Sequence, residues 1–199
     1  NRWPFRIHAT YNESITRFLN VIEEIDKETP LNGLLWFFDH GETVSVENLK
    51  RIKALNGGLA IQHRMAYQGE SFIKRYGKTA AANTVPLKKI LDMGIKVGMG
   101  TDGTRVASYN PWVGLYWLTT GKTLGGLKYM NDENIQDRTA ALKLFTYGSA
   151  QLINLEKDRG MLTANKLADF AILSDDYFNT PEEKILNIES ELTVVNGKV

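Results

Sequence analysis

The sequence predicts an α/β fold of parallel strands and alternating helices, about half of a (β/α)8 barrel. Short apolar runs alternate four times with segments whose apolar residues recur at helical spacing. This alternation is typical of parallel strands joined by right-handed crossovers. A complete barrel takes roughly 250 residues, and the chain has 199. An open doubly wound sheet is the rival architecture, but no GxGxxG or P-loop motif is present to support a nucleotide.

The first two strand–helix units are expected in the N-terminal third of the chain. A strand over Trp3–Ala9 is followed by a helix over Ser14–Lys27, whose apolar residues lie three or four positions apart. The continuous apolar run Leu34–Phe38 is typical of a strand buried on both faces. Ser45 is a suitable N-cap for a second helix, which Asn56-Gly57-Gly58 ends.

The third and fourth units contain a longer irregular stretch. A short strand is expected over Leu59–Ile61, and the less periodic segment Met65–Asn83 is expected to be a loop. Thr84 then caps a helix that has Pro86 in its first turn. The fourth strand, Ile95–Thr101, runs into glycines and a single acid.

The C-terminal part changes in character. Helices are expected near Val113–Thr120 and around Asp137–Ile153, and two β-rich stretches follow at Leu167–Leu173 and Glu191–Val195. The sequence therefore predicts a helical barrel region over residues 1–158 and a small β layer over residues 159–199.

Composition excludes several classes of function. The net charge of +1 gives no reason to expect a nucleic-acid partner. No cysteine is present, so neither a disulfide nor a thiolate metal site is expected. No apolar run approaches the roughly 20 residues of a membrane span, and no signal-peptide pattern is present, so we expect no membrane partner and a cytoplasmic location. Because the chain begins with Asn1, we expect it to be a piece of a longer protein.

The rare chemical groups gather at the ends of the predicted strands. His8, His40, His63 and Asp102 each fall at or just after the carboxyl end of one strand. In a parallel barrel these ends converge on the face where active sites form. Two imidazoles and a carboxylate suit Zn²⁺ or a similar divalent ion, which lowers the pKa of bound water so that a carboxylate can take its proton. The alternatives are that each histidine is a core or capping residue, and that Asp102 belongs to a plain turn.

Three further residues are candidates for substrate contacts. His63 and Arg64 follow the third strand directly, and Asn110 lies in the loop after the fourth. His63 could equally be an ordinary loop residue, and the aromatic residues beside Asn110 could simply pack. No GxSxG motif is present, which disfavours a serine nucleophile.

Five segments resemble a known family. They are HATYNES, the strand ending DH, GTDGTRVASYNPW, GMLTANKLADFAILSDDYF and ELTVVNGKV. With them the whole chain resembles the C-terminal part of an amidohydrolase-superfamily enzyme of the amidohydrolase family 3 type. The resemblance implies a metal-dependent hydrolase that acts on carbon–nitrogen (non-peptide) or related bonds of a small-molecule substrate. It also implies strands five to eight of a TIM-type barrel and the C-terminal part of a small β-sandwich.

The resemblance assigns roles to three residues. His8 would be the metal ligand on strand five and His40 the ligand on strand six, while Asp102 would be the strand-eight aspartate that binds metal and acts as general base. The metal would be zinc, with one or two ions in the intact enzyme. The chain has no H-x-H pair, so we expect it to lack the full metal site.

Two other departures concern supporting residues. The pattern His-Ala-x-Gly-Asp expected after the strand-five histidine ends here in Asn12, and the usual glycine before Lys166 is Asn165. Half a barrel also leaves two sheet edges unpaired, so we expect the chain to need a missing N-terminal half or a second copy of itself. The alternative function is a non-catalytic half-barrel scaffold or a small-molecule-binding subunit.

Overall fold

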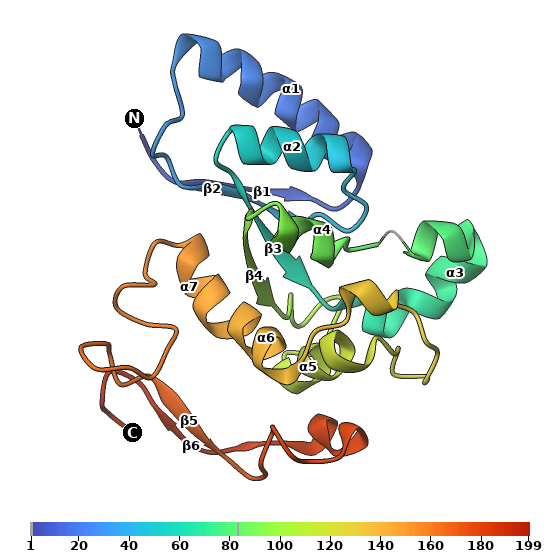
Figure 1. Cartoon of the computed structure of the whole chain (residues 1–199), viewed down its shortest axis with the longest axis vertical. Coiled ribbons are helices and arrows are strands. Elements are labelled where there is room, and N and C mark those ends of the chain that lie inside the picture. The colour runs from blue at the N-terminus through green and yellow to red at the C-terminus, as the bar shows by residue number, and fades with distance from the viewer. Residues whose placement is uncertain (1, 83) are drawn as a thin grey trace.

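A four-stranded parallel sheet forms the centre of the molecule (Figure 1). The computed structural model describes residues 2–82 and 84–199. The strands are β1 (Phe5–Ala9), β2 (Trp36–His40), β3 (Gly58–Gln62) and β4 (Lys96–Gly100), and they pair in chain order. Because each strand is parallel to the next, every connection crosses over the sheet. The predicted α/β fold with a parallel sheet is therefore confirmed.

Helices α1 (Asn12–Glu28) and α2 (Val46–Ala54) pack side by side over β1 and β2 (Figure 1). Side chains alternate between the two faces of a strand. Trp36 and Phe38 therefore point toward these helices, where they are almost fully buried and contact each other edge to face. The Trp36 indole donates a hydrogen bond to the carbonyl of Leu55 at the end of α2. Ser45 caps α2 as predicted, since its side chain accepts from the backbone of Asn48.

The predicted loop over Met65–Asn83 is wrong for the residues that the structure describes there. Residues 64–82 form α3 (Arg64–Ala82), with a kink at Gly77, and Asn83 lies outside the described residues. Gly69, a residue with poor helix propensity, weakens the local signal. It is needed because a Cβ there would lie 2.7 Å from the ring of Tyr129. Tertiary packing thus stabilises a helix that local propensity does not predict.

The predicted capping role of Thr84 is also wrong. Its hydroxyl donates to the carbonyl of Ala81 and is hydrogen-bonded to the hydroxyl of Tyr129. The following helix, α4 (Leu87–Asp92), is preceded by Pro86 and has no side-chain cap. Thr84 is therefore used to close the end of α3 against a distant tyrosine.

The next helices follow the predicted order. They are α5 (Pro111–Thr120), a 3-10 turn η1 (Asp132–Asn134), and a helical run of α6 (Arg138–Lys143), the π-helical turn η2 (Leu144–Gly148) and α7 (Ser149–Leu152). The single helix expected around Asp137–Ile153 is thus interrupted by a π turn. The turn η2 and α7 pack on β4. They pack on the side opposite to α1 and α2 (Figure 1).

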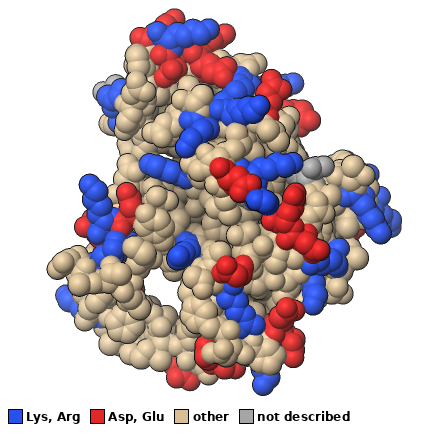
Figure 2. All heavy atoms as spheres, viewed as in Figure 1, with Lys and Arg blue, Asp and Glu red and all other residues tan. Residues whose placement is uncertain are grey.

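The chain closes with a small β layer, as predicted. Strand β5 (Phe170–Leu173) pairs antiparallel with β6 (Ser190–Val194), and the 3-10 turn η3 (Glu182–Asn187) lies between them. Acidic and basic side chains are interspersed on the face shown in Figure 2, in keeping with the small net charge. None of the described helices has the length and apolar character that a membrane crossing requires.

Candidate functional site

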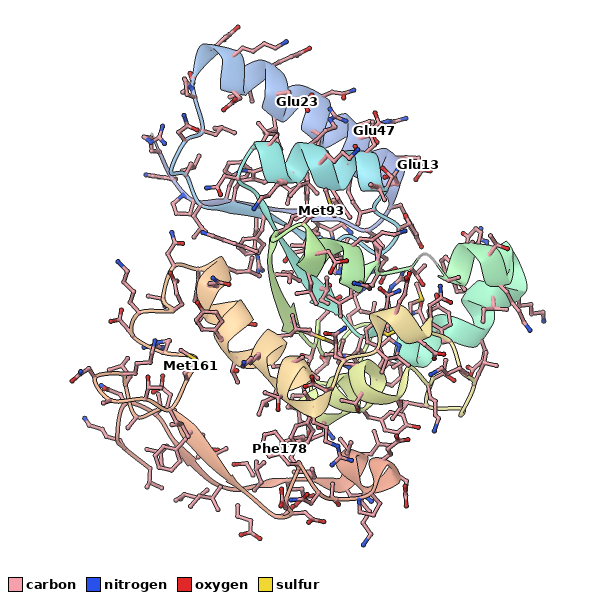
Figure 3. All side chains as sticks on the ribbon, viewed as in Figure 1. Glu13, Glu23, Glu47, Met93, Met161 and Phe178 are labelled. Carbon is pink, nitrogen blue, oxygen red and sulfur yellow. The ribbon has the colours of Figure 1, made fainter. Side chains whose placement is uncertain are left out.

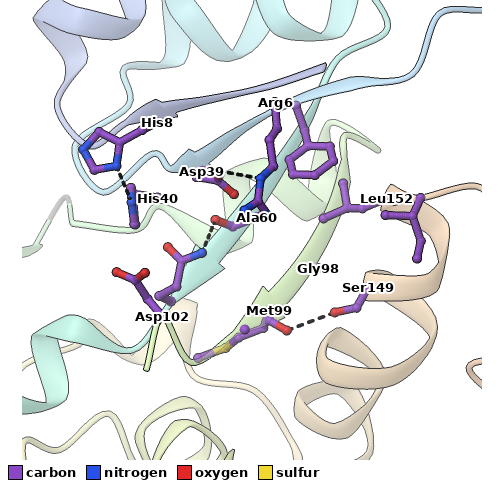
Figure 4. A pocket seen from close by; sticks show the side chains of 14 residues that line it. Arg6, His8, Asp39, His40, Ala60, Gly98, Met99, Asp102, Ser149 and Leu152 are labelled. Carbon is purple, nitrogen blue, oxygen red and sulfur yellow. Dashed lines mark hydrogen bonds and ion pairs between the residues drawn. The ribbon is translucent and has the colours of Figure 1, made fainter. Parts of the chain in front are cut away.

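A cavity of about 510 Å³ opens on the sheet face opposite to α1 and α2 (Figure 4). Residues from all four strands line it, together with Asp102 beyond β4 and the end of the α7 helix. Most of the lining residues from the strands alternate with residues of the apolar core, as the pleat of a sheet requires, and His40 at the end of β2 is an exception. The polar lining residues from the strands are Arg6, His8, Asp39, His40 and Gln62.

The rings of His8 and His40 meet in this cavity (Figure 4). Nδ1 of His8 lies 2.9 Å from Nε2 of His40, and the two ring planes are 75° apart. His8 is exposed, whereas His40 is buried. Two nitrogens bound to one tetrahedral zinc ion lie about 3.3 Å apart, given zinc–nitrogen bonds of about 2.0–2.1 Å. The observed 2.9 Å is a hydrogen bond between the two rings, so the rings lie side by side but would have to move apart by a few tenths of an ångström to share one ion.

His40 contacts His8 although simple strand alternation predicts otherwise. In the β1–β2 register His8 is opposite Asp39, and His40 is opposite Ala9. Alternation alone would place His40 on the core face with the buried Ala9. His40 has a left-handed backbone, with φ of 81°, a conformation that costs a non-glycine residue roughly 1–2 kcal/mol. We attribute the meeting of the two rings to this turn at the last residue of β2.

Asp102 lines the same cavity from two residues beyond the end of β4. Its side chain is exposed and its φ is 52°, a region that aspartate adopts more readily than most residues. In the wall of the cavity, Arg6 and Asp39 form an ion pair with 3.6 Å between Nε and Oδ2 (Figure 4). The cavity thus holds two imidazoles, two carboxylates and one guanidinium.

The chemistry of the donors fits a metal better than their spacing does. Two neutral imidazoles and a carboxylate are ligands that zinc accepts. Within residues 2–82 and 84–199, however, no three His, Asp or Glu side chains lie close enough together to hold a metal ion. The structure brings His8 and His40 together and places Asp102 in the same cavity. The role of all three as ligands stays a prediction.

His63 lies in the core beside the cavity and is not one of its lining residues. Its ring is fully buried, with the ring of Tyr67 at 5.9 Å between centroids. Among the described residues, neither ring nitrogen has a hydrogen-bond partner of normal geometry. Burial lowers the pKa of His63 to about 4, and an interaction with the backbone of Gly100 opposes this only in part. The ring is therefore neutral at pH 7, and its substrate role stays a prediction.

Arg64 is not a lining residue either, because its guanidinium is bound to Glu42. Nε donates to Oε1 of Glu42 at 2.7 Å, and Nη2 contacts Oε2. This bond to a buried carboxylate raises the pKa of Arg64. Sequence reasoning missed Glu42, because a single glutamate in a loop carries no signal beyond its place two residues after His40.

Asn110 and Asn12 both organise the backbone. The side chain of Asn110 caps α5 by accepting from the backbone of Trp112 at 2.9 Å, and it does not line the cavity; its substrate role stays a prediction. Oδ1 of Asn12 accepts from the backbone of Ser45 and from the amide of Asn48, both at 2.8 Å. Asn12 therefore joins the segment after His8 to the segment after β2, which is a supporting role despite the departure from the expected aspartate.

Comparison of sequences links the chain to a family of hydrolases. The model of the amidohydrolase family matches residues 1–199. The chain is 28% identical over 197 residues to YtcJ of Bacillus subtilis (strain 168), a protein assigned by name to the amidohydrolases. It is 28% identical over 131 residues to a 5-methylthioadenosine/S-adenosylhomocysteine deaminase of Thermococcus kodakarensis. These alignments cover 97% and 60% of the chain but 36% and 29% of the relatives, so the chain spans about a third of their length.

Solved structures share the fold. An uncharacterized metal-dependent hydrolase from Pyrococcus horikoshii matches with a TM-score of 0.73 and 23% identity, covering 90% of this chain and 35% of that one. A mutant of the atrazine chlorohydrolase TrzN from Arthrobacter aurescens, complexed with zinc and atraton, matches with a TM-score of 0.64 and 18% identity. That match covers 98% of this chain and 43% of the other. At these identities the likeness concerns the fold.

Proposed function

The chain belongs to the amidohydrolase family, and we propose that it forms the C-terminal part of a metal-dependent hydrolase. In this proposal β1 to β4 are strands five to eight of a (β/α)8 barrel, and the β5–β6 hairpin is the C-terminal part of a small β-sandwich. The likeness to larger metal-dependent hydrolases supports the assignment. The rest of the barrel would come from an N-terminal half or from a second copy of the chain.

The contact between His8 and His40 carries the proposal. Their ring nitrogens lie 2.9 Å apart in a cavity that Asp102 also lines. We propose that His8, His40 and Asp102 hold a divalent metal ion, with zinc as the first choice. When bound, such an ion activates water for attack on an electrophilic carbon. The carboxylate of Asp102 would accept the proton of that water, since a carboxylate at the cavity wall can act as a general base.

The substrate in this proposal is a small molecule with a carbon–nitrogen bond that is not a peptide bond, or a related bond. A cavity of about 510 Å³ is of the size that accepts small molecules. The sequence likeness to a deaminase supports the hydrolysis of a carbon–nitrogen bond. Because Arg64 is bound to Glu42 and Asn110 caps α5, these two would act on such a substrate only indirectly, through the segments that they hold. A role of the buried His63 in substrate binding stays a prediction.

Zinc binding by the purified chain tests the proposal. After equilibrium dialysis against Zn²⁺, elemental analysis should find zinc in the parent chain, none in His8→Asn or His40→Asn, and less in Asp102→Asn. His63→Asn is the matched control, because it removes the third histidine outside the cavity and should leave the zinc content unchanged. Zinc content that does not depend on His8 and His40 would refute the site.

A non-catalytic scaffold or a small-molecule-binding subunit is the second candidate function. It is favoured by the finding that, in the described part of the chain, no three acidic or imidazole side chains are gathered for a metal. This alternative predicts a metal-free parent chain whose behaviour the Asp102→Asn substitution does not change. The same dialysis experiment therefore decides between the two.

A further inference from the structure

We propose that the buried ion pair between Glu42 and Arg64 is a positioning device that holds the ring of His40 toward His8. The inference rests on the proposed function in one respect: there, the ion pair serves to hold a metal ligand in position before the metal binds. Its structural content, the orientation of one imidazole toward another, can be tested without any metal.

The residues after β2 form a turn that needs support from elsewhere. His40 and Gly41 are consecutive left-handed residues, with φ of 81° and 60°. The amide of Gly41 donates to the carbonyl of Ala9 at 3.0 Å, which ties the start of the turn to the end of β1. A Cβ at Gly41 would lie 2.8 Å from Cδ2 of Leu59, so the turn is packed tightly on β3. One end of the strained turn is thus fixed by the sheet.

Glu42 fixes the other end of the turn through both its side chain and its backbone. Its side chain is almost fully buried, and both carboxylate oxygens bind the guanidinium of Arg64. Its carbonyl accepts from the amide of Val85 at 2.6 Å. A strained backbone conformation such as that of His40 persists only where neighbouring residues hold it in place. The hydrogen bonds of Glu42, two residues further on, provide this support.

Arg64 connects this anchor to the neighbouring strand ends. It is the first residue of α3 and follows β3 by two positions. Besides Glu42, its guanidinium reaches Oε1 of Gln68 at 2.9 Å and the hydroxyl of Tyr11 at 3.5 Å. Tyr11 lies in the segment after β1. One planar fork thus ties together the segments after β1, β2 and β3, which the single ammonium of a lysine could not reproduce.

Spectra of the three imidazoles test the inference directly. Long-range ¹H–¹⁵N spectra of the metal-free chain, assigned with His→Asn variants, should show one fixed tautomer each for His8 and His40. Glu42→Gln should shift both sets of signals toward the averaged values of a free imidazole. Zinc affinity in a competition assay should fall about ten-fold or more, as is usual when a group supporting a ligand is lost.

A second bidentate ion pair provides the matched control. Arg51 donates to both oxygens of Glu23 at 2.7 Å and joins α2 to α1, about three helical turns along α1 from Asn12 (Figure 3). Glu23→Gln breaks a pair of the same bidentate geometry, although Glu23 is 38% exposed and Glu42 only 2%, and it should leave the imidazole signals and the zinc affinity at parent values. A change in Glu23→Gln equal to that in Glu42→Gln would overturn the inference, because the effect would then be general loosening.

The double variant Glu42→Gln/Arg64→Gln covers the case in which a single variant fails to fold, because it leaves no unpaired charge in the core. Averaged imidazole signals in this folded double variant support the inference, and signals identical to the parent overturn it. Fixed tautomers in a parent chain that binds no zinc, together with averaged signals in Glu42→Gln, would refute the proposed metal site and leave the positioning role supported. The two failures are therefore distinguishable.

Discussion

The backbone of Ser149 lies directly against Gly98 in β4. A Cβ at Gly98 would come within 2.8 Å of both the nitrogen and the Cα of Ser149. The hydroxyl of Ser149 donates to the carbonyl of Met99 at 2.9 Å, which holds α7 on this strand (Figure 4). The missing side chain of Gly98 therefore makes room for the backbone of α7.

Gly98→Ala is expected to destabilise the chain by about 1–3 kcal/mol, because a backbone segment cannot move aside as a flexible side chain can. For a protein of this size, that loss lowers the melting temperature by roughly 2–4 °C per kcal/mol. Chemical and thermal denaturation measure it. The control is Gly100→Ala on the same strand, where a Cβ would meet nothing within 4 Å. Equal losses in the two variants would contradict the packing argument.

Substitution of Asn12 tests the link between the segments after His8 and His40. Asn12→Ala leaves two buried or half-buried donors, from Ser45 and Asn48, without their acceptor, and should cost about 1–3 kcal/mol of unfolding free energy. Asn12→Asp keeps the acceptor oxygen and places a negative charge at the start of two helices, so its effect should be within about 0.5 kcal/mol. Urea denaturation at pH 7 compares the two, and a larger loss for Asp than for Ala would refute the acceptor role.

His63 should make the folded state sensitive to acid. Its pKa is about 4 in the folded chain, below the value of about 6.5 for an unfolded histidine. The unfolded chain therefore binds more protons between these values, so this contribution to stability is complete above pH 6.5 and is lost as the pH falls toward 4. A depression of this size corresponds to about 3 kcal/mol.

The variant His63→Leu isolates this contribution, because a leucine fills the buried space without titrating. Urea denaturation of both chains between pH 7.5 and 4 should show the parent losing about 3 kcal/mol more than the variant. Parallel curves for the two proteins would mean that His63 has an ordinary pKa when folded.

Self-association is expected from the open edges of the sheet. Among the described strands, β1 and β4 each pair on one side only. Ile172 of β5 and Val195, just after β6, are 49% and 59% exposed. Such edges and apolar side chains favour pairing with another chain. Analytical ultracentrifugation should find a dimer or a larger species at micromolar concentration. A monomer that melts cooperatively would show that the chain needs no partner.

The sequence by itself determined the order of the strands, every α-helix of the described chain except α3, and the location of the candidate chemistry. Apolar runs and helical periodicity are local signals, so they located the four strands of the parallel sheet. The placement of His8, His40 and Asp102 at the ends of these strands brought the three residues to one cavity. The five characteristic segments also identified the family, which the match over residues 1–199 confirms. These features depend on the residue types along each segment alone.

Tertiary structure decided what each of those residues contacts. Three features depend on residues from other strands and loops. They are the left-handed turn at His40, the ion pair between Arg64 and Glu42, and the burial of His63. Helix α3 forms across Gly69 because Tyr129, sixty positions away, packs against it. Contacts between segments distant in the chain leave no periodic pattern in either one. Local reasoning therefore located the candidate site but could not assign which side chains face the cavity and which hold its walls.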